Sequence, residues 1–187
     1  MEKRKIIAIT GNIAGGKSNV VNSLAKKLGM GTYFASRRFR ELARNHNMDI
    51  ATFNEFIEKN PEIDRTIDDI MSEYLKNHNN LVVDSRLAWF FEKDAFKVFI
   101  KVDLETAAKR LMLDSKNRNI EENYDTVDAA KFAIIKRQNY EKDRYKKEYG
   151  IDILDYSNYD LVIDSTNLST DEISNKIIEE YNEWLQK

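Results

Sequence analysis

The chain has 187 residues, of which 42% are hydrophobic, and its formal net charge at pH 7 is −2. This length and composition predict one α/β domain over residues 1–187 with a hydrophobic core, and the charge excludes a global basic field for nucleic acid or an anionic membrane. The sequence contains no cysteine, which excludes disulfides, metal thiolates and a thiol nucleophile.

The N-terminal segment and the histidines narrow the class of protein further. The first apolar run is about five residues long, too short for the core of a signal peptide, and no run approaches membrane-spanning length. His46 and His78 lie in polar, asparagine-rich surroundings typical of exposed loops, so no zinc site is expected. We therefore expect a cytoplasmic, monomeric enzyme that acts on small molecules, with neither nucleic acid nor membrane as a partner.

The first predicted unit is a strand, a glycine-rich turn and a helix. Residues 4–10 contain a continuous apolar run typical of a buried parallel strand, and apolar residues recur at helical spacing over 17–28, just before Gly29. The turn reads Gly11-Asn12-Ile13-Ala14-Gly15-Gly16-Lys17-Ser18 and fits the phosphate-binding loop pattern. The flanking strand and helix make a chance match in a surface turn the weaker interpretation.

Each part of this loop has a physical task in binding a nucleoside triphosphate. Glycines allow amide N–H groups to converge on an anion, and the following helix directs its positive dipole end to the same point. Lys17 should reach the β- and γ-phosphates, and the Ser18 hydroxyl should ligate Mg²⁺. We therefore expect ATP and Mg²⁺ as cofactors. The expected cofactor-binding residues are Gly11, Asn12, Ile13, Ala14, Gly15, Gly16, Lys17, Ser18 and Asn19.

A helical segment follows a short second strand at residues 32–34. Ser36 can cap a helix over about 37–45, and Thr52 with Glu55 forms a capping-box pattern for a second helix. Asn60-Pro61 predicts the start of a third helix, with a capping side chain followed by proline at the first helical position. Residues 36–78 are thus predicted to form a helical insertion between the second and third strands.

Strands and helices alternate in the rest of the chain. The predicted elements are strands over 81–84, 95–102 and 159–164, helices over 104–112, about 125–148 and 170–186, and a polar, mobile loop over 114–123. This alternation predicts a parallel sheet with right-handed crossovers, whose carboxyl ends gather ligands. The segments expected at that edge are the phosphate loop, Asp84-Ser85-Arg86, Asp103 and Asp164-Ser165-Thr166.

Two residues at the carboxyl end of the third strand, Asp84 and Arg86, are candidates for binding phosphate or its metal ion. Asp84 ends an apolar strand, where phosphate-loop proteins place a carboxylate that holds Mg²⁺, often through water; the alternative is a cap for the following turn. Arg86 lies at the same edge, which favours a phosphate contact over a solvated surface position.

Arginines on the long charged helix are candidates for binding the molecule that accepts the phosphoryl group, called the acceptor below. Arg137 and Arg144 lie seven residues apart and share a helix face with Glu141 between them. Such a helix alone is usually only solvated. Transfer between two phosphates, however, brings two anions together, and fixed guanidinium groups can hold both. Arg40 is a further candidate, and an acceptor phosphate requires no general base.

At these residues the chain resembles the cytidylate kinases, in particular the short, archaeal-type form. The similar segments are the phosphate loop, Phe39 to Ala43, Asn60 to Asp64, Asp84 to Ala88, Arg137 to Tyr145, Tyr149 to Asp152 and Tyr159 to Asp164. The resemblance implies a three-layer P-loop fold with a five-stranded parallel sheet, a nucleoside-monophosphate-binding insert at about 35–78 and a lid at about 113–123. It implies Mg²⁺-dependent transfer of the ATP γ-phosphoryl group to CMP or dCMP.

The resemblance also implies roles for particular residues. Arg40, Arg86, Arg137 and Arg144 would hold the acceptor, with Glu141 near its nucleoside. Arg110 and Arg118 would clamp the transferring phosphoryl group from the lid, so the catalytic residues would be Lys17, Arg86, Arg110, Arg118, Arg137 and Arg144. The segment from Ser165 to Asn167 would lie against the adenine. The acceptor side would also include Ser36 and Arg37, from the turn before Arg40.

This sequence departs from the family pattern at two places. Ala35-Ser36-Arg37-Arg38 replaces a turn of small residues, which could change the base that is recognised, and Ser85 replaces a glycine between the acid and Arg86. Two other functions therefore stay open at the level of sequence. One is a kinase for a hydroxyl, such as a deoxynucleoside kinase, with Asp84 as general base. The other is a nucleotide-binding regulatory protein with little catalysis.

Overall fold

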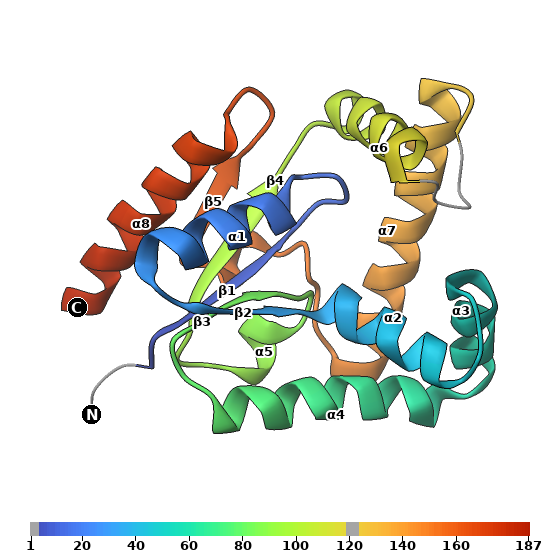
Figure 1. Ribbon diagram of the computed structural model, residues 1–187, viewed down its shortest axis with the longest axis horizontal. Coiled ribbons are helices and arrows are strands. Elements are labelled where there is room, and N and C mark those ends of the chain that lie inside the picture. The colour runs from blue at the N-terminus through green and yellow to red at the C-terminus, as the bar shows by residue number, and fades with distance from the viewer. Residues whose placement is uncertain (1–3, 119–123) are drawn as a thin grey trace.

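The computed structural model of the chain (Figure 1) describes residues 4–118 and 124–187. Its centre is a five-stranded sheet in the order β2-β3-β1-β4-β5, and every neighbouring pair is parallel. The predicted five-stranded parallel sheet is therefore confirmed. The strands are β1 (Ile6–Gly11), β2 (Gly31–Phe34), β3 (Leu81–Asp84), β4 (Phe96–Lys101) and β5 (Leu161–Asp164).

The strand register brings the carboxyl ends of all five strands to one edge. Asp84, the last residue of β3, is the register partner of Ile9 in β1 and of Phe34 in β2. On the other side, Gly11 pairs with Ile100 and Lys101 pairs with Asp164. After β1 the chain continues to β2 on one side of that strand, and after β3 it crosses to β4 on the other side, so this edge is the expected place for a ligand.

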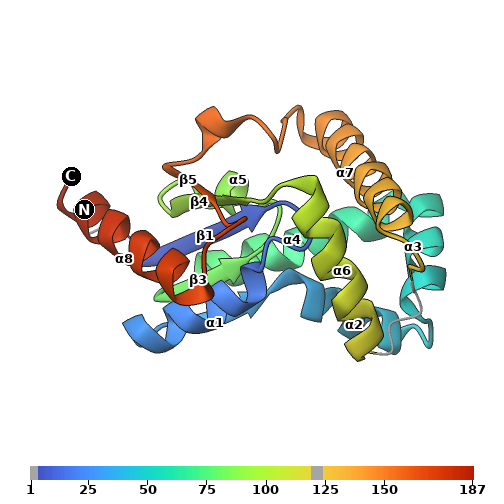
Figure 2. The same ribbon diagram turned by 90° about the horizontal axis from the view of Figure 1, so that it is seen from above.

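Helices cover both faces of the sheet (Figure 2). Helices α1 (Lys17–Leu28) and α8 (Thr170–Gln186) lie on one face, where Leu24 and Ile177 belong to a buried cluster with side chains of β1 and β4. On the other face lie α4 (Pro61–Asn77), the short α5 (Ala88–Phe91) and α7 (Val127–Tyr149), which contribute Leu75, Trp89 and Tyr145 to a second cluster. These layers are those of the predicted three-layer fold.

The excursion between β2 and β3 consists of α2 (Ala35–Asn45), α3 (Ile50–Lys59) and α4, and is called the insert below. Phe53 and Ile57 anchor a separate hydrophobic cluster within it. The insert starts without a connecting loop, because α2 follows β2 directly and Phe34 occupies the N-cap position. The prediction that Ser36 caps this helix is therefore wrong.

Two other predicted caps differ from those in the structure. The side chain of Asp49 accepts a hydrogen bond from the Thr52 amide at 2.7 Å and caps α3, so the capping box predicted at Thr52 is wrong. Pro61 is the first residue of α4, as predicted, but the Asn60 amide group donates back to the Phe56 carbonyl at 2.7 Å and does not cap α4.

Helix α6 (Leu104–Arg118) continues through part of the segment predicted to be a mobile loop. The prediction is wrong for residues 114–118, which are helical, and residues 119–123 lie outside the described residues. Within the described ranges, α5 and a 3-10 turn at Tyr156–Asn158 also lack a counterpart in the sequence prediction. No helix in the described part of the chain is both long and apolar enough to span a membrane.

Candidate active site

The phosphate loop is built by backbone conformations that particular residues permit. Gly11 has φ of 145°, and a Cβ there would collide with the carbonyl oxygen of Ile100 in β4. Gly16 has φ of 79° and stands at the N-cap of α1 without any side-chain cap. Amide groups in the first turn of α1 therefore remain available to an anion, and the helix dipole favours negative charge at this position.

Asn12 ties the loop to the sheet. Its backbone amide donates to the Ile100 carbonyl at 2.9 Å, and its side-chain Oδ1 accepts from the backbone amide of Val102 at 3.2 Å. Ala14, two residues later, has φ of 56°, a conformation that residues with a Cβ seldom adopt. The loop is thus held in a conformation that its own residue preferences would not select, as expected of a preformed binding site.

Lys17 turns its ammonium group toward the backbone of the loop. Its Nζ donates to the Asn12 carbonyl at 2.6 Å and to the Gly11 carbonyl at 3.3 Å. Burial and then the nearby guanidinium of Arg86 lower the pKa of Lys17 to about 7, against a smaller opposite effect of Asp84 and Glu141. A cation destabilised in this way would gain from a phosphate anion bound beside it.

Ser18 and Asp84 supply two oxygen atoms at the start of α1. The Ser18 hydroxyl donates to Oδ2 of Asp84 at 3.0 Å, across from β3. Within the described residues no group of three or more His, Cys, Asp or Glu gathers to form a protein-only metal cage. A hydroxyl and one carboxylate nevertheless fit Mg²⁺, which keeps several waters and takes the rest of its ligands from nucleotide phosphates.

Arg86 and two residues of α7 form a charged cluster against the phosphate loop. Glu141 forms an ion pair with Arg86 Nε at 2.8 Å and accepts a hydrogen bond from Arg137 Nε at 3.0 Å, and Arg86 also donates to the Gly11 carbonyl. Burial alone would raise the pKa of Glu141, but the two guanidinium groups outweigh it and hold that pKa below its ordinary value. A small pocket lies beside the cluster, lined by residues that include Gly11, Arg86 and Glu141.

Arg144, which was predicted to share a face with Arg137, pairs with a different acid from the one that binds Arg137. Its Nη2 is 3.5 Å from Oδ2 of Asp68, a residue of α4 that is only 9% exposed. The hydroxyl of Tyr149 donates to the same carboxylate oxygen at 2.8 Å. The sequence reasoning did not single out Asp68, because an acid in the middle of a charged helix carries no signal of its own.

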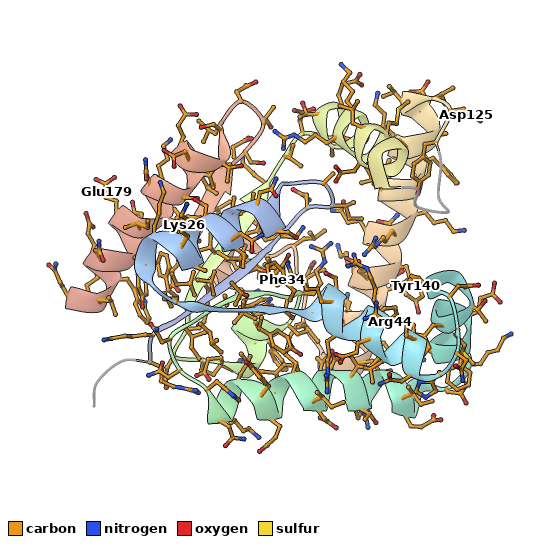
Figure 3. All side chains as sticks on the ribbon, in the orientation of Figure 1. Lys26, Phe34, Arg44, Asp125, Tyr140 and Glu179 are labelled. Carbon is orange, nitrogen blue, oxygen red and sulfur yellow. The ribbon has the colours of Figure 1, made fainter. Side chains whose placement is uncertain are left out.

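The remaining acceptor candidates lie on α2 and are exposed. Ser36 and Arg40 are exposed, and Arg40 has no hydrogen bond or ion pair with the part of the chain that the structure describes. The guanidinium of Arg37 stacks over the ring of Phe34 at 4.0 Å from its centroid. Phe34 is buried where β2 passes into α2, and it is labelled near the centre of the view in Figure 3. The roles of these three residues toward an acceptor stay predictions.

The two arginines predicted for the lid have different positions. Arg110 donates to the Ser165 carbonyl at 2.9 Å and to the Thr166 carbonyl at 3.3 Å, so it braces the loop after β5. Ser165 is fully buried, and its hydroxyl reaches the Gly15 carbonyl at 3.3 Å. Arg118 is the last residue of α6 and its side chain is outside the described part. Phosphoryl clamping by either arginine stays a prediction.

The two departures from the family pattern have local structural explanations. The hydroxyl of Ser85 accepts a hydrogen bond from the Leu87 amide at 3.1 Å, so this serine stabilises the turn that leads to α5. Arg38 is exposed and pairs with Glu41 at 2.7 Å, one turn along α2. Both side chains are therefore engaged within their own segments.

Comparison with known proteins supports the resemblance noted above. A sequence family described as an AAA domain matches residues 7–131. A cytidylate kinase of Thermoplasma acidophilum is 34% identical over 185 residues, which cover 97% of this chain and 94% of that protein. The chain belongs to the cytidylate kinase family. Another cytidylate kinase, from Sulfolobus acidocaldarius, is 33% identical and covers 92% of this family member and 91% of its own length.

Other matches show proteins that are similar to this cytidylate kinase family member in sequence or in fold. An S-adenosylmethionine-dependent nucleotide dehydratase of Lacinutrix mariniflava is 34% identical over 94% of the chain, but the match covers only 35% of that larger protein. The solved shikimate kinase of Bacteroides thetaiotaomicron superposes with a TM-score of 0.62 at 16% identity, over 98% of this chain and 99% of its own. The shikimate kinase of Acinetobacter baumannii gives 0.60 at 18% identity, over 95% and 93%. These structures establish the fold alone.

Proposed function

We propose that this protein transfers the γ-phosphoryl group of ATP to CMP or dCMP and releases ADP with CDP or dCDP. The observation that carries the proposal is the contact between the phosphate loop and the charged cluster of Arg86, Arg137 and Glu141. Arg86 joins the backbone of the phosphate loop at Gly11 and the carboxylate of Glu141 on α7. A donor bound by the loop and an acceptor bound by Arg86 would therefore meet with their phosphates adjacent.

The residues of the loop would bind and orient the donor. Lys17 would exchange its backbone contacts for the β- and γ-phosphates, and amide groups of the loop would hold the other phosphate oxygens. Ser18 and Asp84 would hold Mg²⁺, which when bound offsets the negative charge of the triphosphate. The position of Asp84 beside the Ser18 hydroxyl suits this metal-side role.

Arg86 and Arg137 would bind the acceptor phosphate. In the structure both guanidinium groups share the carboxylate of Glu141, and an incoming phosphate offers them a second anion of suitable geometry. Because that phosphate is already an anionic nucleophile, positioning and charge neutralisation are sufficient, and no residue is needed to remove a proton. Arg40 and Arg144 would complete the acceptor side from α2 and α7.

A single assay tests the proposal against its alternatives. ADP release is measured with Mg²⁺ and ATP, alone and with CMP, dCMP, UMP, AMP, GMP, cytidine or deoxycytidine. We expect CMP or dCMP to give the largest stimulation, and Lys17→Ala to raise the barrier by about 3 kcal/mol, as for a lost electrostatic contact in a transition state. Stimulation by nucleosides alone would indicate a hydroxyl kinase. ATP binding without stimulation by any acceptor would indicate a regulatory protein.

A further inference from the structure

The contact between Asp68 and Arg144 joins the insert to the core of the protein. Asp68 is in α4, which belongs to the insert, and Arg144 is in α7, which packs on the sheet. The side chains are 12% and 23% exposed, so both charged groups are largely removed from water. A carboxylate in such a place is stable only when it is paired and hydrogen-bonded, and Arg144 and Tyr149 supply those contacts.

The position of Arg144 along α7 suits a contact with the acceptor beyond its phosphate end. Glu141, which joins Arg86 and Arg137, lies three residues before Arg144 on the same helix. At the rise of an α-helix this separation is about 4.5 Å along the axis, which is less than the length of a nucleotide. An acceptor held by Arg86 can therefore extend along α7 to Arg144.

The hydrogen bond from Tyr149 makes the carboxylate of Asp68 a fixed reference for Arg144. Tyr149 is on the last turn of α7, so one helix supplies both the arginine and the hydroxyl that orients the arginine's partner. A free arginine side chain loses much rotational freedom when it binds a ligand, and holding it in place beforehand reduces that loss. We propose that Asp68 is a positioning residue that holds Arg144 in place for the acceptor nucleotide. This inference rests on the proposed function and deepens it.

A second ion pair between the same two helices provides a matched control. Arg65 of α4 lies 3.1 Å from Glu148 of α7, but its side chain is 64% exposed and the pair includes none of the proposed acceptor residues. Such a pair contributes little to stability. Arg65→Gln therefore removes a link between insert and core, while the contacts of Asp68 with Arg144 and Tyr149 stay in place.

The experiment compares steady-state kinetics of wild type, Asp68→Asn, Asp68→Glu and Arg65→Gln with the best nucleoside monophosphate of the panel. We expect Asp68→Asn to raise KM for the acceptor about tenfold, as for one lost charge-assisted hydrogen bond, with KM for ATP unchanged within about twofold. Asp68→Glu should recover part of the loss, and Arg65→Gln should resemble wild type. In the Arg144→Ala background, Asp68→Asn should have no further effect on the acceptor KM.

Several results would overturn the inference. One is an acceptor KM of Asp68→Asn that equals that of Arg65→Gln. Another is an acceptor KM of the double variant that equals the product of the separate effects of Asp68→Asn and Arg144→Ala. If Asp68→Asn does not fold, Tyr149→Phe replaces it: a rise of about threefold in the acceptor KM is expected, and an unchanged KM refutes the inference. A wild type that no nucleoside monophosphate stimulates would refute the proposed function itself, whereas an active wild type with insensitive variants refutes only the role of Asp68.

Discussion

Raising the pH should weaken the binding of ATP, because Lys17 then loses its proton in the free protein. Burial and Arg86 lower the pKa of this lysine to about 7, from an ordinary value of 10.5. That difference corresponds to about 5 kcal/mol of destabilisation of the charged ammonium. Bound phosphates would reverse part of it, so the pKa of Lys17 should rise when the nucleotide binds.

The expected size of the effect follows from these two protonation equilibria. Well below pH 7 the ammonium is charged in both states, and the affinity should not change through this group. Above pH 7 the free protein must take up a proton to bind ATP, so the affinity falls until the pKa of the complex is reached. With a pKa of about 7 in the free protein, the affinity should fall roughly eightfold between pH 7.5 and 8.5.

Isothermal titration calorimetry can measure both consequences. Titrations of Mg²⁺-bound ATP at pH 7.5 and 8.5 give the two affinities, and repeating them in buffers of different ionisation enthalpy gives the number of protons taken up. We expect about one proton at pH 8.5. Lys17→Arg is the control, since a guanidinium stays charged throughout this range and should abolish both the proton uptake and the loss of affinity. Equal wild-type affinities at the two pH values, without proton uptake, would refute the reasoning.

Four further substitutions test other parts of the site. Gly11→Ala should lower the free energy of unfolding by about 3 kcal/mol, because the new Cβ would collide with the Ile100 carbonyl. Gly16→Ala has open space around it and should lower that free energy by only about 1 kcal/mol. Urea unfolding compares the two variants. Asp84→Asn should raise the Mg²⁺ concentration for half-maximal ADP release by about tenfold, and an unchanged Mg²⁺ titration would contradict the metal-side role. Glu141→Gln should destabilise the protein by about 2 kcal/mol, and inorganic phosphate should restore part of that loss in the same unfolding assay.

The donor side of the site could be predicted from the sequence because its determinants are local. The glycines, Lys17 and Ser18 are adjacent in the chain, and the strand and helix around them have clear apolar patterns. Asp84 could be placed as well, because it ends an apolar strand and the carboxyl ends of parallel strands lie together. Its contact with Ser18 joins residues that are 66 positions apart.

The acceptor side could be predicted only in part, because its contacts depend on tertiary structure. Helical spacing placed Arg137 and Arg144 on one face, but the partner of each is decided by what packs against that face. Arg137 meets Glu141 and, through it, Arg86, whereas Arg144 meets Asp68 of the insert. No local pattern distinguishes Asp68 from the other acids of its helix.

Errors in the helix boundaries have similar causes. Ser36 is a good capping residue in isolation, but β2 runs directly into α2 and the stacked Arg37 and Phe34 occupy the junction. At α3, Asp49 was available as a cap earlier in the chain and took precedence over Thr52. Polar composition over 114–118 indicated a loop, although helix α6 continues there, because polar residues are equally compatible with a solvated helix.

The insert leaves and rejoins the sheet at two strands that are neighbours, since β2 and β3 pair directly. Its hydrophobic cluster around Phe53 and Ile57 is separate from the two clusters on the faces of the sheet. The insert leaves the sheet after Phe34 and returns at Leu81, at the opposite ends of two parallel strands, so α4 runs along the sheet and packs Met71 and Leu75 against it. The part with a core of its own, from α2 to the start of α4, can be exchanged between enzymes without disturbing the phosphate loop. A chimera that carries this part of the insert from another kinase should therefore still bind ATP. Its specificity for the acceptor nucleotide should follow that of the kinase from which the segment was taken.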